Sequence, residues 1–113
     1  MTAARSDATS ETIRIFEKWG LRLGRNSPKE FLLTELLKLL ENYGFQIERN
    51  RKSGSHYTVV FHPDLKGHQL APSQRIQIPI IHNRKRETVT KYKVQEFVPL
   101  ITYLRQTGDY DSE

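Results

Sequence analysis

The sequence predicts an α+β fold: a two-layer α-β-β-β-α sandwich, with a three-stranded antiparallel sheet and two helices on one face. Three observations predict it. A leucine-rich segment with helical spacing comes first, three short segments rich in β-branched and aromatic residues follow, and a second apolar helical segment lies near the end. The apolar faces of these segments supply both sides of one core.

The first clear helix is expected over residues 28–43. Ser27-Pro28-Lys29-Glu30 has the pattern of a capping box, in which the Ser27 hydroxyl and the Glu30 carboxylate accept from each other's backbone N–H groups. Gly44 is suited to a left-handed C-cap, with the apolar Phe45 just beyond it. The core stripe between these ends consists of Leu33, Leu36, Leu37 and Leu40.

Three strands are expected at residues 45–50, 55–62 and 75–81. The segment 63–73 between the second and third strands contains two prolines and a glycine, which predicts a long loop. Pro79 indicates that the third strand lies at a sheet edge, because proline has no N–H to offer a neighbouring strand.

The last helix is expected to begin near Thr88 or Thr90, since either threonine can cap it. Pro99 lies inside this helix and predicts a kink, or two short helices that meet there. With these elements the main domain covers residues 27–107. Residues 1–26 are expected to be an extension, partly disordered or with one short helix near 11–18, and residues 108–113 an acidic tail. This order of elements is the topology of double-stranded RNA-binding domains, but topology alone assigns no function.

Composition limits the chemistry. The chain has 113 residues and no cysteine, which excludes disulfides, thiolate metal sites and a cysteine nucleophile. No apolar run approaches the roughly 20 residues of a membrane span. Residues 1–10 lack the apolar segment of a secretory signal. We therefore expect a soluble protein of the cytoplasm.

Positive charge is concentrated in one half of the chain. Ten Lys/Arg and three Asp/Glu lie between Gly44 and Lys93, a net charge of +7, whereas the rest carries eight basic and ten acidic residues, a net charge of −2. A local basic field attracts polyanions such as RNA, because binding releases condensed counterions. The alternative is a solvated face that serves solubility.

The sharpest motif is Arg49-Asn50-Arg51-Lys52-Ser53-Gly54-Ser55-His56, a polar turn that delivers a histidine at the start of a strand. Alternation along this strand places Tyr57, Val59 and Phe61 on the core face, so we expect His56 to point outward. An imidazole both accepts and donates protons near neutral pH. It can remove the proton of an RNA 2′-hydroxyl, which then attacks the adjacent phosphorus, while nearby cations stabilise the developing charge. The alternative is an ordinary histidine on an RNA-binding surface.

Several of these segments resemble the HicA toxin family. The similarity covers Gly44-Phe45, Arg49, Ser53-Gly54-Ser55-His56-Tyr57, Phe61-His62-Pro63-Asp64 and Ile78-Pro79-Ile80-Ile81-His82, in the family's order and spacing. It extends over residues 28–104, and residues 1–26 have no counterpart. The resemblance implies a fold like a double-stranded RNA-binding domain and metal-independent cleavage of messenger RNA, without a cofactor. It also implies that His56 is the catalytic residue and that a HicB-type antitoxin binds a toxin that is monomeric when free.

The other histidines and the basic residues are expected to have different roles. His82 is a candidate second acid/base if the outer strands bring it to His56. His62 is expected to be a strand-end residue that pairs with Asp64, and His68 a loop residue. A zinc site of His56, His62 and His82 is conceivable, but nothing in the spacing favours it. The residues expected to bind RNA phosphates are Arg51, Lys52, Ser55, Arg84 and Lys85.

Two other functions compete with the ribonuclease. A non-catalytic RNA-binding module would share the fold and the basic surface, and would bind RNA without cleaving it. A protein-interaction domain would use the N-terminal segment and the edge of the third strand as docking surfaces.

Overall fold

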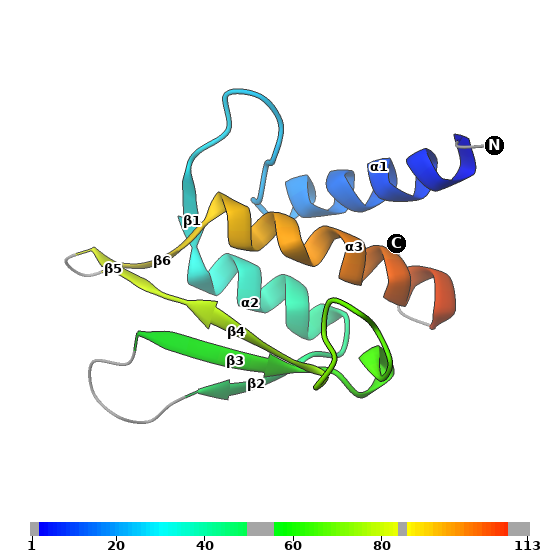
Figure 1. The fold of residues 1–113 in the computed structure, drawn as a ribbon. Helices are drawn as coiled ribbons and strands as arrows, with labels where there is room; N and C mark the ends of the chain where they lie inside the picture. Colours follow the sequence, from blue (N-terminus) through cyan, green and yellow to red (C-terminus); the bar gives the residue numbers. More distant parts are fainter. Residues whose placement is uncertain (1–2, 50–55, 84–85, 109–113) are drawn as a thin grey trace.

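The structure, a computed structural model, describes residues 3–49, 56–83 and 86–108 (Figure 1). Within these ranges the chain forms three α-helices, one 3-10 turn and two three-stranded antiparallel sheets, which confirms the α+β class. In chain order the elements are α1 (Ala3–Lys18), β1 (Glu30–Leu32), α2 (Leu33–Asn42), β2 (Gln46–Arg49), β3 (Tyr57–Phe61), η1 (Pro63–Leu65), β4 (Arg75–Pro79), β5 (Ile81–Asn83), β6 (Arg86–Thr90) and α3 (Lys91–Thr107).

The predicted three-stranded sheet is present, with the strand order β2-β3-β4. Both ladders are antiparallel, and Val60 of β3 lies opposite Ile47 of β2 and Ile76 of β4. The strand that contains Pro79 lies at one edge of this sheet, as the proline indicated.

A second sheet, with the order β1-β6-β5, was not predicted. Its β5 follows β4 after a single residue, Ile80, so one extended segment pairs first with β3 and then with β6 (Figure 1). The chain thus passes from one sheet to the other at Ile80.

The prediction of a capping box and of a helix from residue 28 was wrong. Glu30–Leu32 forms β1, and α2 begins only at Leu33. Pairing with β6 makes this segment extended and buries Phe31 in the core, while the Ser27 N–H donates to the carbonyl of Gly24 at 3.2 Å. The Glu30 carboxylate accepts instead from Thr88 Oγ1 at 2.8 Å, and the buried Ser27 Oγ has no hydrogen-bond partner among the described residues.

The predicted alternation of β3 was also wrong. Thr58 and Val60 are buried, whereas Tyr57 is 38% exposed on the opposite face. The larger side chains of Tyr57 and Phe61 favoured the reverse assignment. His62, of the same parity as Val60, fits the core because both of its ring nitrogens have hydrogen-bond partners there.

The helix ends follow the sequence signals more closely. Gly44 has φ +90° after α2, and the N–H of Phe45 donates to the carbonyl of Leu40 at 3.0 Å. Thr90 caps α3, where its Oγ1 accepts from the N–H of Lys93 at 3.3 Å. The α3 helix is one continuous element across Pro99 rather than two helices.

The N-terminal segment contributes a helix longer than predicted, from Ala3 to Lys18, and this helix covers the core. Phe16 of α1 is fully buried, and Thr102 Oγ1 of α3 donates to Thr12 Oγ1 at 2.7 Å. In the view of Figure 1, α1, α3 and α2 lie in succession above the β2-β3-β4 sheet. No helix in the described ranges is both long and apolar enough to span a membrane.

Candidate functional site

His56 lies at the end of the β2-β3-β4 sheet, just before β3, and its side chain is exposed. Its carbonyl accepts from the N–H of Ile80 at 2.8 Å, which extends the β3–β4 ladder by one step. Exposure was predicted, but for the wrong reason. By parity His56 belongs with the buried Thr58, and it reaches solvent because the start of β3 projects past the N-terminal end of α2 (Figure 1).

His82 is the residue that the structure brings next to His56. It lies on β5, two residues after Ile80. The two imidazole ring centres are 6.0 Å apart, with an angle of 80° between the ring planes. The passage of the chain from one sheet to the other produces this contact, because His56 precedes a strand of the first sheet and His82 belongs to the second.

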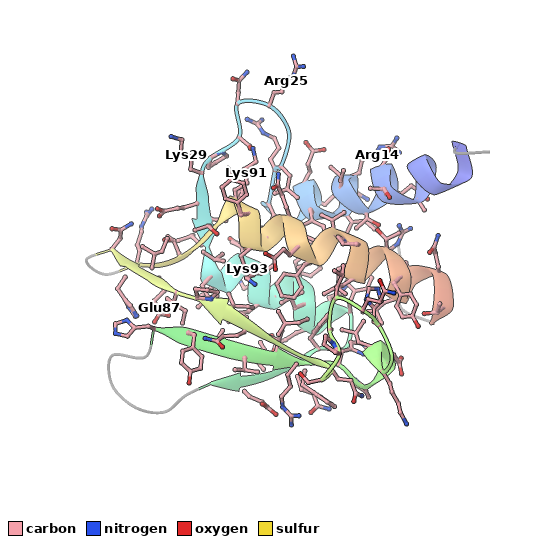
Figure 2. All side chains as sticks on the ribbon, in the orientation of Figure 1. Arg14, Arg25, Lys29, Glu87, Lys91 and Lys93 are labelled. Carbon is pink, nitrogen blue, oxygen red and sulfur yellow. The ribbon has the colours of Figure 1, made fainter. Side chains whose placement is uncertain are left out.

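Glu87 completes the site, and the sequence interpretation missed it. It lies directly opposite His82 in the β5–β6 ladder, and its Oε2 is 3.9 Å from His82 Nδ1. Figure 2 shows Glu87 beside the start of β3. Residues 83–87 were interpreted as a polar connection, so the short hairpin that pairs the two residues went unrecognised. Both side chains are about 40% exposed, which keeps their electrostatic attraction weak.

The predicted phosphate-binding residues fall outside the described ranges. These residues are Arg51, Lys52, Ser55, Arg84 and Lys85. In the sequence, three of them precede His56 within five positions, and the other two follow the strand of His82 directly. Arg86 also belongs to the basic segment that follows His82, and it lies within the described ranges. It is exposed at the start of β6.

His62 is a buried structural residue. Its Nδ1 accepts from the backbone N–H of Asp64 at 3.1 Å, so Nε2 carries the proton and donates to the carbonyl of Tyr43 at 2.8 Å. The ring also packs edge-on against Phe45. The expected local pairing with Asp64 is therefore present, through the backbone of Asp64. His62 and His56 flank opposite ends of β3, roughly 20 Å apart at 3.3 Å per residue.

The hypothetical zinc site of three histidines does not form, because His62 is remote from the other two. In the described part of the chain, no three His, Asp or Glu side chains are grouped so that they could hold a metal ion. His68 is also separate: its ring packs against Tyr103, and its Nδ1 accepts from the N–H of Leu70.

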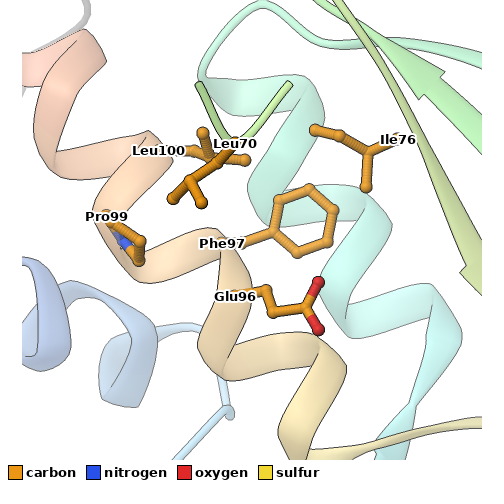
Figure 3. Close-up of a pocket in the computed structure, with 6 residues that line it drawn as sticks. All are labelled: Leu70, Ile76, Glu96, Phe97, Pro99 and Leu100. Atoms are coloured by element: carbon orange, nitrogen blue, oxygen red, sulfur yellow. The ribbon is translucent and has the colours of Figure 1, made fainter. Parts of the chain in front are cut away.

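An apolar pocket of about 230 Å³ lies at the other end of β4, between this strand, the 66–74 loop and α3 (Figure 3). Its single charged lining residue, Glu96, is engaged by Lys93 Nζ at 2.8 Å. No set of titratable groups converges on this pocket, so it is a poor candidate for acid–base chemistry. The remaining lining residues are Leu70, Ile76, Phe97, Pro99 and Leu100.

Fold and site together define an α+β protein with an exposed pair of histidines at the junction of two sheets. Comparisons with protein-family models, with curated proteins and with solved structures find no match for this chain. A functional assignment therefore depends on the chain's own residues.

Proposed function

We propose that this protein is a metal-independent endoribonuclease that cleaves messenger RNA by attack of the 2′-hydroxyl on the adjacent phosphorus. The observation that carries the proposal is the proximity of His56 and His82, whose ring centres are 6.0 Å apart at an exposed edge. Transfer of the nucleophile's proton and protonation of the leaving oxygen need two groups on opposite sides of one phosphodiester. Two adjacent imidazoles meet this requirement.

In the proposed reaction, His56 accepts the proton of the 2′-hydroxyl. The 2′-oxygen forms a bond to phosphorus as the bond to the 5′-oxygen breaks, and His82 donates a proton to that departing oxygen. The products are a 2′,3′-cyclic phosphate and a 5′-hydroxyl. The histidines end in the opposite protonation states, and the return of one proton through water restores them.

Glu87 supports the assignment of His82 as the acid. The Glu87 carboxylate lies 3.9 Å from His82 Nδ1 and weakly attracts that side of a protonated ring. We therefore assign Nε2 of His82 to proton donation. Among the described residues no carboxylate forms such a pair with His56, which fits its role as the base. The cations Arg51, Lys52, Arg84 and Lys85, with Ser55, are proposed to bind the phosphate.

The biological setting is proposed from the sequence resemblance alone. We place the protein among toxins of the HicA kind, in the cytoplasm, with a HicB-type antitoxin as its partner. The β2-β3-β4 sheet with α2 and α3 would then correspond to the layers of a double-stranded RNA-binding domain. Expression of the chain should arrest growth, and co-expression of the neighbouring reading frame should relieve the arrest.

The central test is cleavage of labelled RNA by purified protein in the presence of a chelator. We expect the His56→Ala variant to lose about 10²–10⁴-fold in rate, the range supplied by a general acid or base. The His68→Ala variant is the matched control and should retain wild-type activity, because His68 is remote from the pair. Wild-type activity in the His56→Ala protein would refute the assignment.

A substrate with a sulfur in place of the 5′-oxygen separates the acid from the base. A thiolate leaves without prior protonation, so it does not need the acid. We expect this substrate to restore the rate of the His82→Ala variant but not that of the His56→Ala variant. If wild-type protein leaves all RNA intact yet binds it, the protein is the non-catalytic RNA-binding module. Absence of any RNA binding at low salt would instead favour the protein-interaction domain.

A further inference from the structure

A second concentration of positive charge surrounds the first turn of α3. Lys29 directly precedes β1 and Lys91 directly follows β6, and the N–H of Lys91 donates to the carbonyl of Lys29 at 2.8 Å. Since Glu30 lies opposite Thr90, the same register places Lys29 opposite Lys91. Residues opposite one another in an antiparallel pair have Cβ atoms about 5 Å apart. The fold therefore starts two lysine side chains from neighbouring positions.

Neither lysine is neutralised by another residue in the described ranges. The neighbouring carboxylate, Glu30, accepts from Thr88 Oγ1 and Asn83 Nδ2 instead. The first turn of α3 contains no acidic residue, although the positive end of the helix dipole favours one there. Like charges opposite one another in a ladder are destabilising. This arrangement thus costs stability, and an anionic ligand would relieve it.

An aromatic ring and an arginine extend the same surface. Tyr92 follows Lys91 in the chain and is 81% exposed. Arg25 is exposed in the loop before β1, and Figure 2 shows it near the tip of this loop, with Lys29 at the base next to Lys91. We call Arg25, Lys29, Lys91 and Tyr92 the Lys29–Lys91 patch.

We propose that the Lys29–Lys91 patch is a second RNA-binding surface, which holds phosphates through its cations and stacks a base on Tyr92. Exposed aromatic rings among cations are typical of surfaces that bind single-stranded nucleic acid. The patch and the histidine pair lie at opposite ends of β6. Glu87 precedes Lys91 by four residues, about 13 Å at 3.3 Å per residue. About four stacked nucleotides, at 3.4 Å each, cover that distance.

This inference depends on the proposed function for the identity of the ligand, and a binding assay tests it without cleavage. The probe is a 2′-O-methylated RNA of about twelve nucleotides, long enough to span both surfaces at 3.4 Å each. Methylation removes the nucleophile, so the full chain binds this RNA without cutting it. Affinity is measured by fluorescence anisotropy across a range of salt concentrations.

The test variant is Lys29→Gln/Lys91→Gln, and the matched control is Lys38→Gln/Lys66→Gln, which removes two exposed lysines elsewhere. Loss of two phosphate contacts should weaken binding roughly 10- to 30-fold near 0.1 M salt and flatten the log–log salt dependence by about 1.4. The Tyr92→Leu variant should bind about tenfold more weakly, with an unchanged salt dependence. The stability of the test variant should equal or exceed that of the wild type, whereas a structural role would lower it.

Equal losses in the test and control variants would overturn the proposal, because net charge alone would then explain binding. Absence of wild-type binding would also overturn it. A parallel arm uses unmodified RNA. The test variant should cleave a dinucleotide at the wild-type rate but show a raised KM for the longer strand. If wild-type protein cleaves nothing while binding still depends on Lys29 and Lys91, the ribonuclease proposal fails and the patch stands.

Discussion

At the scale of single residues, parity along a strand proved a weak guide to which histidine is exposed. His62 has the parity of the buried Val60, and the core accommodates it because Tyr43 and Asp64 satisfy both ring nitrogens. His56 has the same parity and is exposed, because it lies beyond the part of the sheet that the helices cover. The difference between a structural and a candidate catalytic histidine is therefore one of position along β3.

Replacement of His62 by alanine should lower the free energy of unfolding by about 2–4 kcal/mol, because it leaves a buried carbonyl and a backbone N–H without partners and opens a cavity. The His62→Asn variant should recover about 1 kcal/mol, since an amide oxygen can accept from the N–H of Asp64. Urea unfolding measures both changes. Loss of RNA cleavage without loss of stability would instead place His62 in the reaction.

At the scale of elements, the α3 helix tolerates a proline in its interior. Pro99 has no N–H to donate to the carbonyl of Gln95, one helical turn earlier, yet Lys91–Thr107 is one helix. Burial explains why the helix persists, because apolar residues on both sides of Pro99 belong to the core. These include Val94, Phe97, Val98, Leu100, Ile101 and Leu104.

The Pro99→Ala variant should therefore be more stable than the wild type by about 2 kcal/mol. Alanine is favoured over proline by about 3 kcal/mol inside a helix, and the greater freedom of the unfolded chain offsets part of this gain. Thermal denaturation checks the prediction, with Gln106→Ala at an exposed position of the same helix as the control. A decrease in stability would mean that the ring's packing beside Leu100 outweighs the missing hydrogen bond.

Local signals predicted the helix ends where no distant strand pairing competes with them, and failed where it does. The leucine stripe, Gly44 and Thr90 mark the helices through contacts within a few residues, and the structure has them as predicted. β1 was missed because Glu30–Leu32 has helical signals and becomes a strand only through pairing with β6, some 58 residues later. Pairing of β5 with β6 places Glu87 beside His82. This hairpin was not predicted, so His82 was expected only as a conditional partner of His56 and Glu87 was missed.

At the scale of the whole molecule, the two sheets and three helices share one core. Buried residues of the core cluster come from α1, α2 and α3 and from strands of both sheets, for example Phe16, Leu36, Val60, Val89 and Ile101. The segment 1–26, which was expected to be an extension, thus supplies part of this core. Because one core packs against both sheets, it also positions the histidine pair. His56 precedes a strand of one sheet, and His82 lies on a strand of the other.

The Phe16→Ala variant tests whether α1 is integral to the fold. Phe16 is fully buried, and truncation of a buried phenylalanine costs about 3–5 kcal/mol. Small domains have only about 5–15 kcal/mol of total stability, so the midpoint of urea unfolding should fall sharply. Glu17→Ala, at an exposed position of the same helix, should change stability by at most about 0.5 kcal/mol. A loss below about 1 kcal/mol for Phe16→Ala would make α1 an appendage, because the core would then be stable without the ring.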